Sequence, residues 1–375
     1  MTVTGILVGL SVTFWALFIY PYVLYPKILG LLSQRPIRAR TVRLSVSILF
    51  CAHNEIECIR EKIDNLRDLK RACPDLEILV YDDASTDGTH EMLAGAGDLL
   101  MVIRGPGRTG KAAGMKRLVA QATGQVLVFT DANIMLATDL ADRLLPYYGD
   151  PEVGGVSGTI KVAAQRDSVT SSVGAAFVTL DDRLQMLESR TGNVMGASGG
   201  LFSVRRELYP DFPDTVQDDF TVSMSVIFRG KRLIKASDVV AYERTVARRE
   251  EELARKVRIG ARAFHTHRFL RPQIANMSAR DRMKYVSRKM LRWFGGVFLA
   301  LGALFGLAAV ATLSMAAAAA LAAGALVMIV ISLRSNAGTL AKLGEMGLAI
   351  FATLLGVLQG MRGRTMATWS PAKSR

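Results

Sequence analysis

Acidic side chains stand where two apolar, strand-like segments of this chain end. Asp82 and Asp83 follow one such segment, while Asp131 closes another and Asn133 comes two residues later. Carboxylate and amide oxygens are preferred ligands of Mg²⁺ and Mn²⁺, and carboxylates also contact ribose or accept protons. Two adjacent carboxylates repel each other unless a ligand or cation is near. A simple turn cap remains an alternative explanation for Asp131 and Asn133.

The segments around these residues alternate between strand-like and helical patterns. Strands are predicted at 44–51, 76–81, 99–103 and 125–129, and helices at 55–71, 86–93 and 111–122. This rhythm predicts a parallel sheet with helices on both faces, and such sheets bind ligands at the carboxyl ends of their strands. The acidic residues fall at those ends, so we expect them to form one site.

A glycine-rich segment, Gly105–Lys111, fits part of the P-loop pattern of nucleotide hydrolases. The next residue is Ala112, where a P-loop needs Ser or Thr to hold magnesium, so a hydrolase of this class is disfavoured. A glycine-rich loop with Arg108 and Lys111 before a helix can still bind a diphosphate.

Long apolar runs flank this block. Residues 1–26 carry no charge, and the basic residues that follow predict a retained membrane helix with the next segment in the cytoplasm. Residues 293–333 are also uncharged and long enough for two crossings, broken near 312–314. The 16-residue stretch 346–361 would reach only about 24 Å as a helix. A span and a surface-lying or re-entrant helix both fit it.

The excess positive charge is concentrated before the second apolar run. The chain has 375 residues and a net charge of +14, and residues 244–292 hold fifteen basic and four acidic residues. Interleaved apolar residues make this stretch amphipathic, which favours an anionic membrane surface. It has no DNA-reading motif, so no nucleic-acid partner is expected. The apolar half of the composition excludes a disordered chain, and three cysteines with four histidines favour neither disulfides nor a histidine-rich metal centre.

Several motifs together resemble glycosyltransferase family 2, in its membrane-bound branch related to cellulose, hyaluronan and poly-N-acetylglucosamine synthases. The resemblance covers about residues 45–293. It is carried by Ser45–Glu55, Asp82–Thr89, Gly110-Lys111, Asp131-Ala132-Asn133, Gly196–Gly200, Asp218-Asp219 and Lys289–Trp293. The chain departs from the family pattern at Cys51–His53, where a proline is common, at Lys116 for Asn, at Asn133 for Asp, and at Lys289 for Gln.

This resemblance implies a GT-A fold, an α/β domain with a mostly parallel sheet, and an inverting transfer from a UDP-sugar. Asp219 would be the general base. The donor would be bound by Glu55, Asp82, Asp83, Lys111 and Asp131, and Mg²⁺ or Mn²⁺ by Asp131 and Asn133. The acceptor would be bound by Gly199, Asp218, Arg292 and Trp293. Two simpler interpretations compete: Asp218 and Asp219 as a helix cap, and Arg292 with Trp293 as interfacial anchors.

The expected organisation has five parts. They are a membrane helix at 1–33, a cytoplasmic GT-A domain at 40–243, amphipathic interface helices at 244–292, membrane helices at 293–362 and a tail at 363–375. The expected location is the inner membrane, with several crossings. The acceptor would be a membrane-associated, lipid-linked saccharide in exopolysaccharide or envelope glycan synthesis. A processive polysaccharide synthase and a catalytically weak sugar-nucleotide-binding protein are the alternatives, and a transporter is disfavoured because the spans lack a buried ionisable pair.

Overall fold

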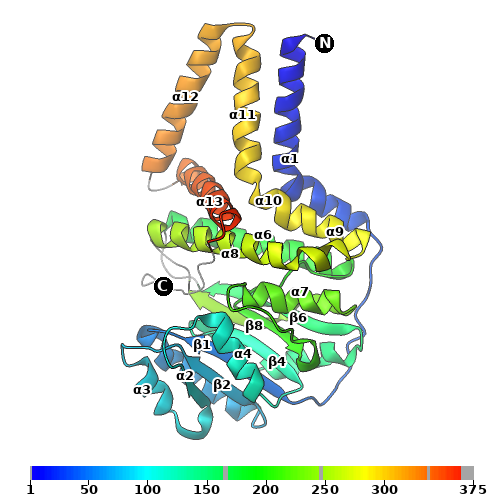
Figure 1. The fold of residues 1–375 in the computed structure, drawn as a ribbon, viewed down its shortest axis with the longest axis vertical. Helices are drawn as coiled ribbons and strands as arrows, with labels where there is room; N and C mark the ends of the chain where they lie inside the picture. The colour runs from blue at the N-terminus through cyan, green and yellow to red at the C-terminus, as the bar shows by residue number, and fades with distance from the viewer. Residues whose placement is uncertain (1, 164–167, 245–247, 336–337, 365–375) are drawn as a thin grey trace.

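The computed structural model describes residues 2–163, 168–244, 248–335 and 338–364. A sheet covered by helices forms one end of the molecule and long apolar helices form the other (Figure 1). The first half of the sheet domain alternates strands and helices as predicted: β1 (Val46–Ala52), α2 (Ile56–Ala72), β2 (Glu77–Asp82), α3 (Thr89–Ala94), β3 (Met101–Arg104), α4 (Lys111–Gln121) and β4 (Val126–Asp131).

The second half of the domain adds strands of both directions. Its elements are β5 (Ile134–Leu136), α5 (Leu140–Leu144), β6 (Val153–Ala163), α6 (Val169–Arg190), β7 (Leu201–Arg205), α7 (Asp218–Phe228) and β8 (Arg232–Arg244). The strand order is β3-β2-β1-β4-β7-β6-β8-β5. Strands β3, β2, β1 and β4 are parallel, β7 is antiparallel to both neighbours, and β8 is parallel to β6.

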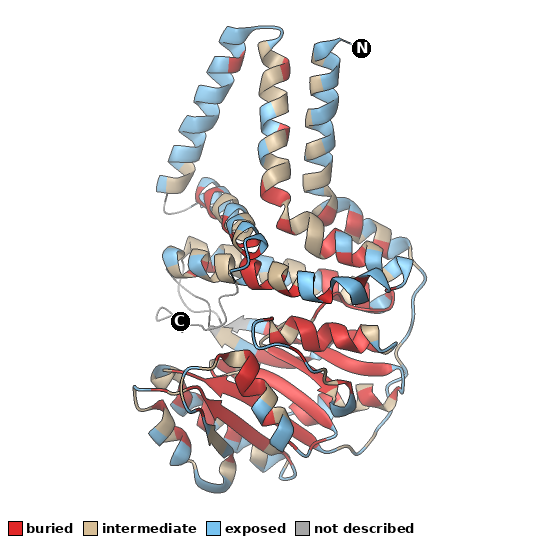
Figure 2. Cartoon of the chain, viewed as in Figure 1, coloured by how far each residue is buried: buried red, intermediate tan, exposed pale blue. Residues whose placement is uncertain are grey.

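Apolar side chains cover both faces of this sheet. All seven residues of β1 are buried, as expected for a central parallel strand with helices on each side. One core cluster includes Ile48 and Ile63, and the other includes Leu49 and Phe202. Apart from the edge strand β3, whose residues are exposed or half-buried, the strands are buried along most of their length (Figure 2). The mixed α/β fold confirms the predicted fold class.

Apolar helices lie at both ends of the chain, as predicted. They are α1 (Val3–Leu31), α11 (Gly295–Ala311), α12 (Met315–Arg334) and α13 (Gly338–Met361). Three of them, α1, α12 and α13, are each long and apolar enough to cross a membrane, and α11 passes that test together with the helices before it. The turn between α11 and α12 falls where the sequence predicts the break.

Helix α13 begins eight residues before the segment expected from the sequence. That expectation took Glu345 as a polar boundary. The structure instead places Glu345 inside the helix, 6% exposed and ion-paired with Arg249. Because the charge is paired, the helix continues through it to a length of 24 residues.

The basic stretch forms helices that connect the two ends of the molecule. Helix α8 (Arg249–Ala275) packs along α13 (Figure 1). It is followed by α9 (Ala279–Tyr285), a π-helical turn (Val286–Met290) and α10 (Leu291–Trp293). The chain then bends by 65° into α11. We call α8, α9, the π-helical turn and α10 the interface helices.

Candidate active site

The parallel register brings the predicted acidic residues to one edge of the sheet. Asp82 pairs with Ala52 of β1, and Asp131 pairs with Cys51 of the same strand. The carboxyl ends of β2, β1 and β4 therefore lie side by side. Glu55 follows β1 directly and stands at the start of α2. The predicted donor edge thus contains residues from three adjacent strand ends.

Asp83 organises the glycine-rich loop. Its fully buried carboxylate accepts hydrogen bonds from the backbone N–H groups of Thr109 and Gly110, at 2.7 and 3.0 Å, and from the Thr109 hydroxyl. Arg108 adds an ion pair at 3.4 Å. The predicted contact of Asp83 with uracil or ribose stays a prediction, and the contacts shown are those that shape the loop before α4.

The turn after β1, which contains Asn54 and Glu55, is hydrogen-bonded to the Asp82–Thr89 loop. The Asn54 backbone N–H donates to the Ser85 hydroxyl at 3.0 Å, and the Glu55 N–H donates to the Thr89 hydroxyl at 3.0 Å. Asp82 is fully buried, accepts a bond from the Ser85 N–H and lies 3.2 Å from Nδ1 of His90. These bonds hold the two predicted donor-binding segments together.

Lys111 connects the donor edge to the second acidic pair. Its Nζ donates to Asp131 at 2.6 Å and lies 3.9 Å from Asp218 at the start of α7. Burial by itself lowers the pKa of Lys111, but the charges of Asp131 and Asp218 outweigh it and raise the pKa above its ordinary value. The lysine therefore stays charged and links β4, α4 and α7.

Asp219 lies against the loop predicted to bind the acceptor. A Cβ atom added to Gly199 would overlap Oδ2 of Asp219. Oδ1 accepts a hydrogen bond from the Phe220 N–H at 2.7 Å. Burial raises the pKa of Asp219, and the neighbouring Asp218 charge raises it further, while Lys111 opposes the shift. A carboxylate with a raised pKa beside an open glycine loop is suited to accept a proton.

The ligands for a divalent cation are few but chemically suitable. Among the described residues, no group of three or more His, Cys, Asp or Glu could hold a metal. Asp131 offers a carboxylate, and Asn133 has a buried Nδ2 without a hydrogen-bond partner in the described part of the chain. Turning that amide over would present its oxygen instead. These residues fit a hard cation that takes its other ligands from a diphosphate.

Two charged residues that the sequence did not single out border the site. Arg262 of α8 is buried, donates to the Val216 carbonyl at 3.1 Å and lies 3.8 Å from Asp218. Lys62 of α2 is fully buried and donates to the Ile134 carbonyl, just after Asn133. Lys62 could have been identified from the sequence because it falls on the apolar face of α2. Arg262 could not, because it is one of many basic residues in its segment.

Arg292 and Trp293 lie among the interface helices. Arg292 pairs with Asp181 at 3.0 Å and stacks on the Phe177 ring. Trp293 is 7% exposed and packs against the rings of Phe264, His267 and Tyr285. The predicted contact of these two residues with the acceptor stays a prediction.

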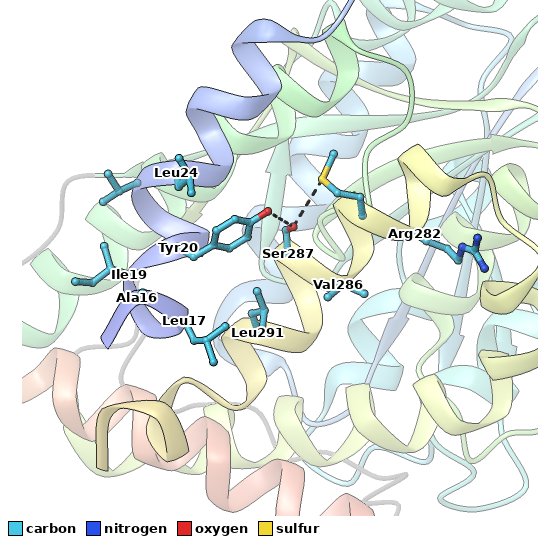
Figure 3. Close-up of a pocket in the computed structure, with 11 residues that line it drawn as sticks. Ala16, Leu17, Ile19, Tyr20, Leu24, Arg282, Val286, Ser287 and Leu291 are labelled. Atoms are coloured by element: carbon cyan, nitrogen blue, oxygen red, sulfur yellow. Dashed lines mark hydrogen bonds between the residues drawn. The ribbon is translucent and has the colours of Figure 1, made fainter. Parts of the chain in front are cut away.

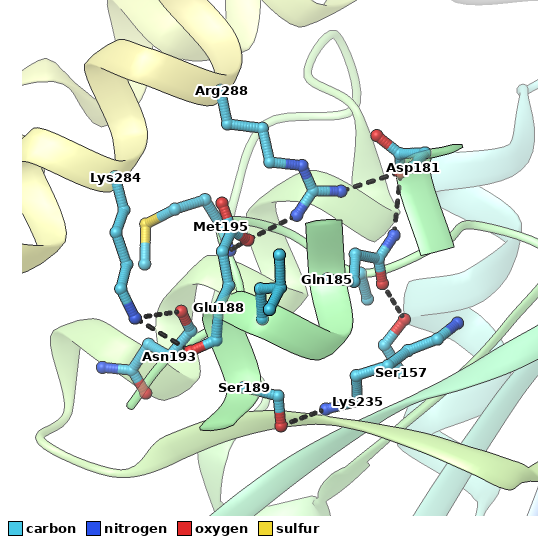
Figure 4. Close-up of polar contacts among 12 residues, drawn as sticks. Ser157, Asp181, Gln185, Glu188, Ser189, Asn193, Met195, Lys235, Lys284 and Arg288 are labelled. Atoms are coloured by element: carbon cyan, nitrogen blue, oxygen red, sulfur yellow. Dashed lines mark hydrogen bonds and ion pairs between the residues drawn. The ribbon is translucent and has the colours of Figure 1, made fainter. Parts of the chain in front are cut away.

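A buried polar network joins the interface helices to the acceptor loop (Figure 4). Glu188 of α6 pairs with Arg288 at 2.6 Å and accepts a bond from the Met195 N–H at 3.0 Å. Asp181 also pairs with Arg288, and a chain of hydrogen bonds runs from it to Ser198. That chain is Asp181–Gln185–Ser157–Ser198. The loop containing Gly199 is therefore held in place from the side of the domain that faces the interface helices.

Comparisons with known proteins identify the family of one part of the chain. Residues 47–212 match the model of the glycosyl transferase family 2. These residues form a glycosyltransferase family 2 domain. The family assignment made from the sequence is thereby confirmed for this part of the chain.

Two curated relatives and one solved structure are similar to this chain. A beta-monoglucosyldiacylglycerol synthase from Nostoc sp. is 25% identical over 49% of this chain and 40% of its own length. One from Synechocystis sp. is 27% identical over 44% of this chain and 35% of its own length. The aligned segment thus spans less than half of these relatives. A mannosyltransferase from Pyrobaculum calidifontis, solved with GDP-Man and Mn²⁺, shares the fold with a TM-score of 0.72 at 23% identity, covering 94% of this chain and 99% of that one.

Proposed function

We propose that this protein transfers a sugar from a UDP-sugar to a hydroxyl group of a membrane lipid, with inversion at the anomeric carbon. The observation that carries the proposal is the contact of Asp219 with Gly199. This contact supports the proposal because the Asp219 carboxylate, whose pKa is raised, lies against the predicted acceptor loop. Asp218 and Lys111 connect the same point to the donor edge.

The chain's own residues divide the reaction between two sides. On the acceptor side, Asp219 takes the hydroxyl proton while the acceptor oxygen bonds to the anomeric carbon. The bond from that carbon to the diphosphate oxygen breaks, and UDP leaves. On the donor side, Lys111 offers a positive charge beside Asp131 to the departing diphosphate. A divalent cation held by Asp131 and Asn133 would neutralise further diphosphate charge.

A lipid acceptor is supported by two independent observations. The curated relatives are named beta-monoglucosyldiacylglycerol synthases. In addition, Arg262 on the interface helix α8 lies beside Asp218, so the acceptor side of the site adjoins the helices that lead to the membrane. We infer a glycerolipid or a lipid-linked saccharide as acceptor, in envelope or exopolysaccharide glycan assembly at the inner membrane.

The test is transfer by the full-length protein reconstituted in vesicles that contain dioleoylglycerol. UDP-glucose, UDP-galactose, UDP-N-acetylglucosamine and GDP-mannose are supplied separately, and the lipid extract is analysed by mass spectrometry. A hexosyl-diacylglycerol formed from one UDP-sugar, and lost on chelation of divalent cations, is the expected result. A high-molecular-weight glycan formed without added lipid acceptor would instead favour the processive synthase.

Asp219→Asn separates catalysis from donor binding. We expect a rate at least a hundredfold lower, since general-base catalysis contributes about 10²–10⁴-fold, with unchanged affinity for the UDP-sugar. Asp68→Asn, an exposed Asp-to-Asn change on α2, is the control and should leave both quantities unchanged. An Asp219→Asn protein that keeps more than about a tenth of the rate would refute the base assignment.

A further inference from the structure

An open groove of about 700 Å³ lies between α1 and the interface helices. Figure 3 shows that α1 forms one wall and the helix containing Arg282–Leu291 forms the other. The Tyr20 and Ser287 hydroxyls meet across it at 3.0 Å. The remaining wall is apolar, with Leu17, Val23 and Leu24 from α1 and Met283, Val286 and Leu291 opposite.

The groove has the surface expected of a protein that faces hydrocarbon. Val23, Leu24 and Val286 are 49, 51 and 42% exposed. Clusters of exposed aliphatic side chains are uncommon on water-facing surfaces. Helix α1, which supplies one wall, is long and apolar enough to cross a membrane. Lipid chains are therefore the medium that would cover these side chains.

One end of the groove is basic and the other is apolar. Arg282 lines the groove at the end of its helix wall away from Leu291 (Figure 3), and its guanidinium also donates to the Ala275 carbonyl at 3.2 Å. The neighbouring Arg280 donates to Ser33 just after α1. Asp281, between the two arginines, accepts bonds from Ser278 and from Asn193 of the sheet domain. The Asp281 carboxylate therefore has its hydrogen-bond partners outside the groove. An apolar slot with arginines at one end is complementary to an anionic amphiphile.

The groove and the polar network behind the predicted acceptor loop lie on opposite faces of the same helix. Met283 and Ser287 face the groove, whereas Lys284 and Arg288 contact Glu188 of the sheet domain. The helix itself therefore separates an occupant of the groove from Asp219. This arrangement suits a bound lipid that is distinct from the substrate.

We propose that this groove binds one acyl chain of an anionic glycerophospholipid, with the lipid phosphate at Arg282. The site adds to the proposed enzymatic function and does not depend on it. A lipid in the groove would be connected to the predicted acceptor loop through two consecutive residues of the helix. Ser287 borders the groove, the next residue Arg288 pairs with Glu188, and Glu188 holds the Met195 N–H.

The test measures lipid binding directly, without activity. The full-length protein in detergent is mixed with dioleoyl-phosphatidylglycerol or dioleoyl-phosphatidylcholine, and retained lipid is counted by native mass spectrometry. We expect one phosphatidylglycerol retained, at least fivefold more than phosphatidylcholine. Val286→Trp, which narrows the groove from the side of the interface helices, should reduce retention at least fivefold. Leu326→Trp, at an exposed position on α12, is the matched control and should not.

The headgroup contact has its own pair of variants. Arg282→Gln should lower phosphatidylglycerol retention to the phosphatidylcholine level, whereas Arg271→Gln, at an exposed arginine of α8 outside the groove lining, should not. Equal retention of the two lipids, or wild-type retention by a folded Val286→Trp, would overturn the proposal. So would displacement of phosphatidylglycerol by equimolar dioleoylglycerol, which would make the groove an acceptor site. If Val286→Trp does not fold, Leu24→Trp tests the same space from α1.

Discussion

At the scale of single residues, the site depends on how the positive side chains of Lys111 and Arg262 are placed against the carboxylates of Asp131, Asp218 and Asp219. Lys111 lies between Asp131 and Asp218, and Arg262 lies beside Asp218. These contacts neutralise Asp131 and Asp218 in part. Asp219 is more weakly compensated, so burial and its neighbour's charge raise its pKa. The two basic side chains thus lie against Asp131 and Asp218, whereas the raised pKa of Asp219 makes it the carboxylate suited to take up a proton.

The first prediction concerns the pH dependence that follows from this arrangement. A general base acts when deprotonated, so kcat/KM should fall as the pH drops through the raised pKa of Asp219. Asp218→Asn removes a charge that raises this pKa, while Lys111 and Arg262 continue to lower it. The acid limb of the kcat/KM profile should therefore move to lower pH. An unmoved or upward-shifted limb would contradict the assignment, and Asp68→Asn provides the control profile.

The second prediction uses the close approach at Gly199. Gly199→Ala would place a methyl group against the Asp219 carboxylate and displace it. We expect kcat to fall at least tenfold, with the affinity for the UDP-sugar unchanged because the donor edge is not touched. Gly174→Ala on α6 is the matched control, since its added Cβ meets no atom within 4 Å. Comparable kcat losses in both variants would show that the Gly199 contact has no special role.

The sequence predicted which site residues follow the ends of strands. It did not predict site residues that come from distant segments of the chain. Asp82 and Asp131 were predictable as neighbours because the carboxyl ends of parallel strands share an edge. The approach of Arg262 to Asp218 depends on how α8 docks on α7. No local pattern fixes that docking, and the residue stands among many other basic side chains.

At the scale of elements, glycines set how closely α8 and α13 approach. A Cβ added to Gly356 would overlap the Val257 carbonyl of α8, and one added to Gly260 would lie 2.7 Å from the Thr353 carbonyl of α13. Small residues on both helices thus allow backbone-to-backbone contact. This packing, together with the Arg249–Glu345 ion pair, places α13 against a helix that also borders the candidate site. The sequence alone showed neither feature, because both require the two helices to be in register.

The third prediction tests this packing. Gly356→Ala should force α8 and α13 apart and destabilise the protein, at a cost of about 1–3 kcal/mol for an overpacked contact. Gly347→Ala lies on the same helix with no atom within 4 Å of the added Cβ, and should be neutral or slightly stabilising. Thermal unfolding of the detergent-purified proteins measures both. Equal melting temperatures for the two variants would argue against close helix contact.

At the scale of the whole molecule, the alternation of strands and helices and the uncharged runs were enough to predict an α/β domain between apolar helices. The second half of the sheet was harder to predict. Strands β6, β7 and β8 pair with partners far away in sequence and in mixed directions. The interface helices were visible as a basic amphipathic stretch. Their division into one face toward the sheet domain and another toward α1 emerged only from the packing.

The last prediction concerns the side of the membrane on which α13 ends. The basic residues after α1 predict a cytoplasmic sheet domain, and α11 with α12 would cross and return. Helix α13 packs along α8, which contacts α7 of that domain, so we expect α13 to lie at the cytoplasmic surface and not to cross. Alkaline phosphatase fused after Arg364 should be inactive, and a fluorescent protein fused there should fluoresce. A phosphatase fusion after Leu313, between α11 and α12, should be active. Phosphatase activity at Arg364 would show that α13 spans the membrane, and its contact with α8 would then have to form inside the bilayer.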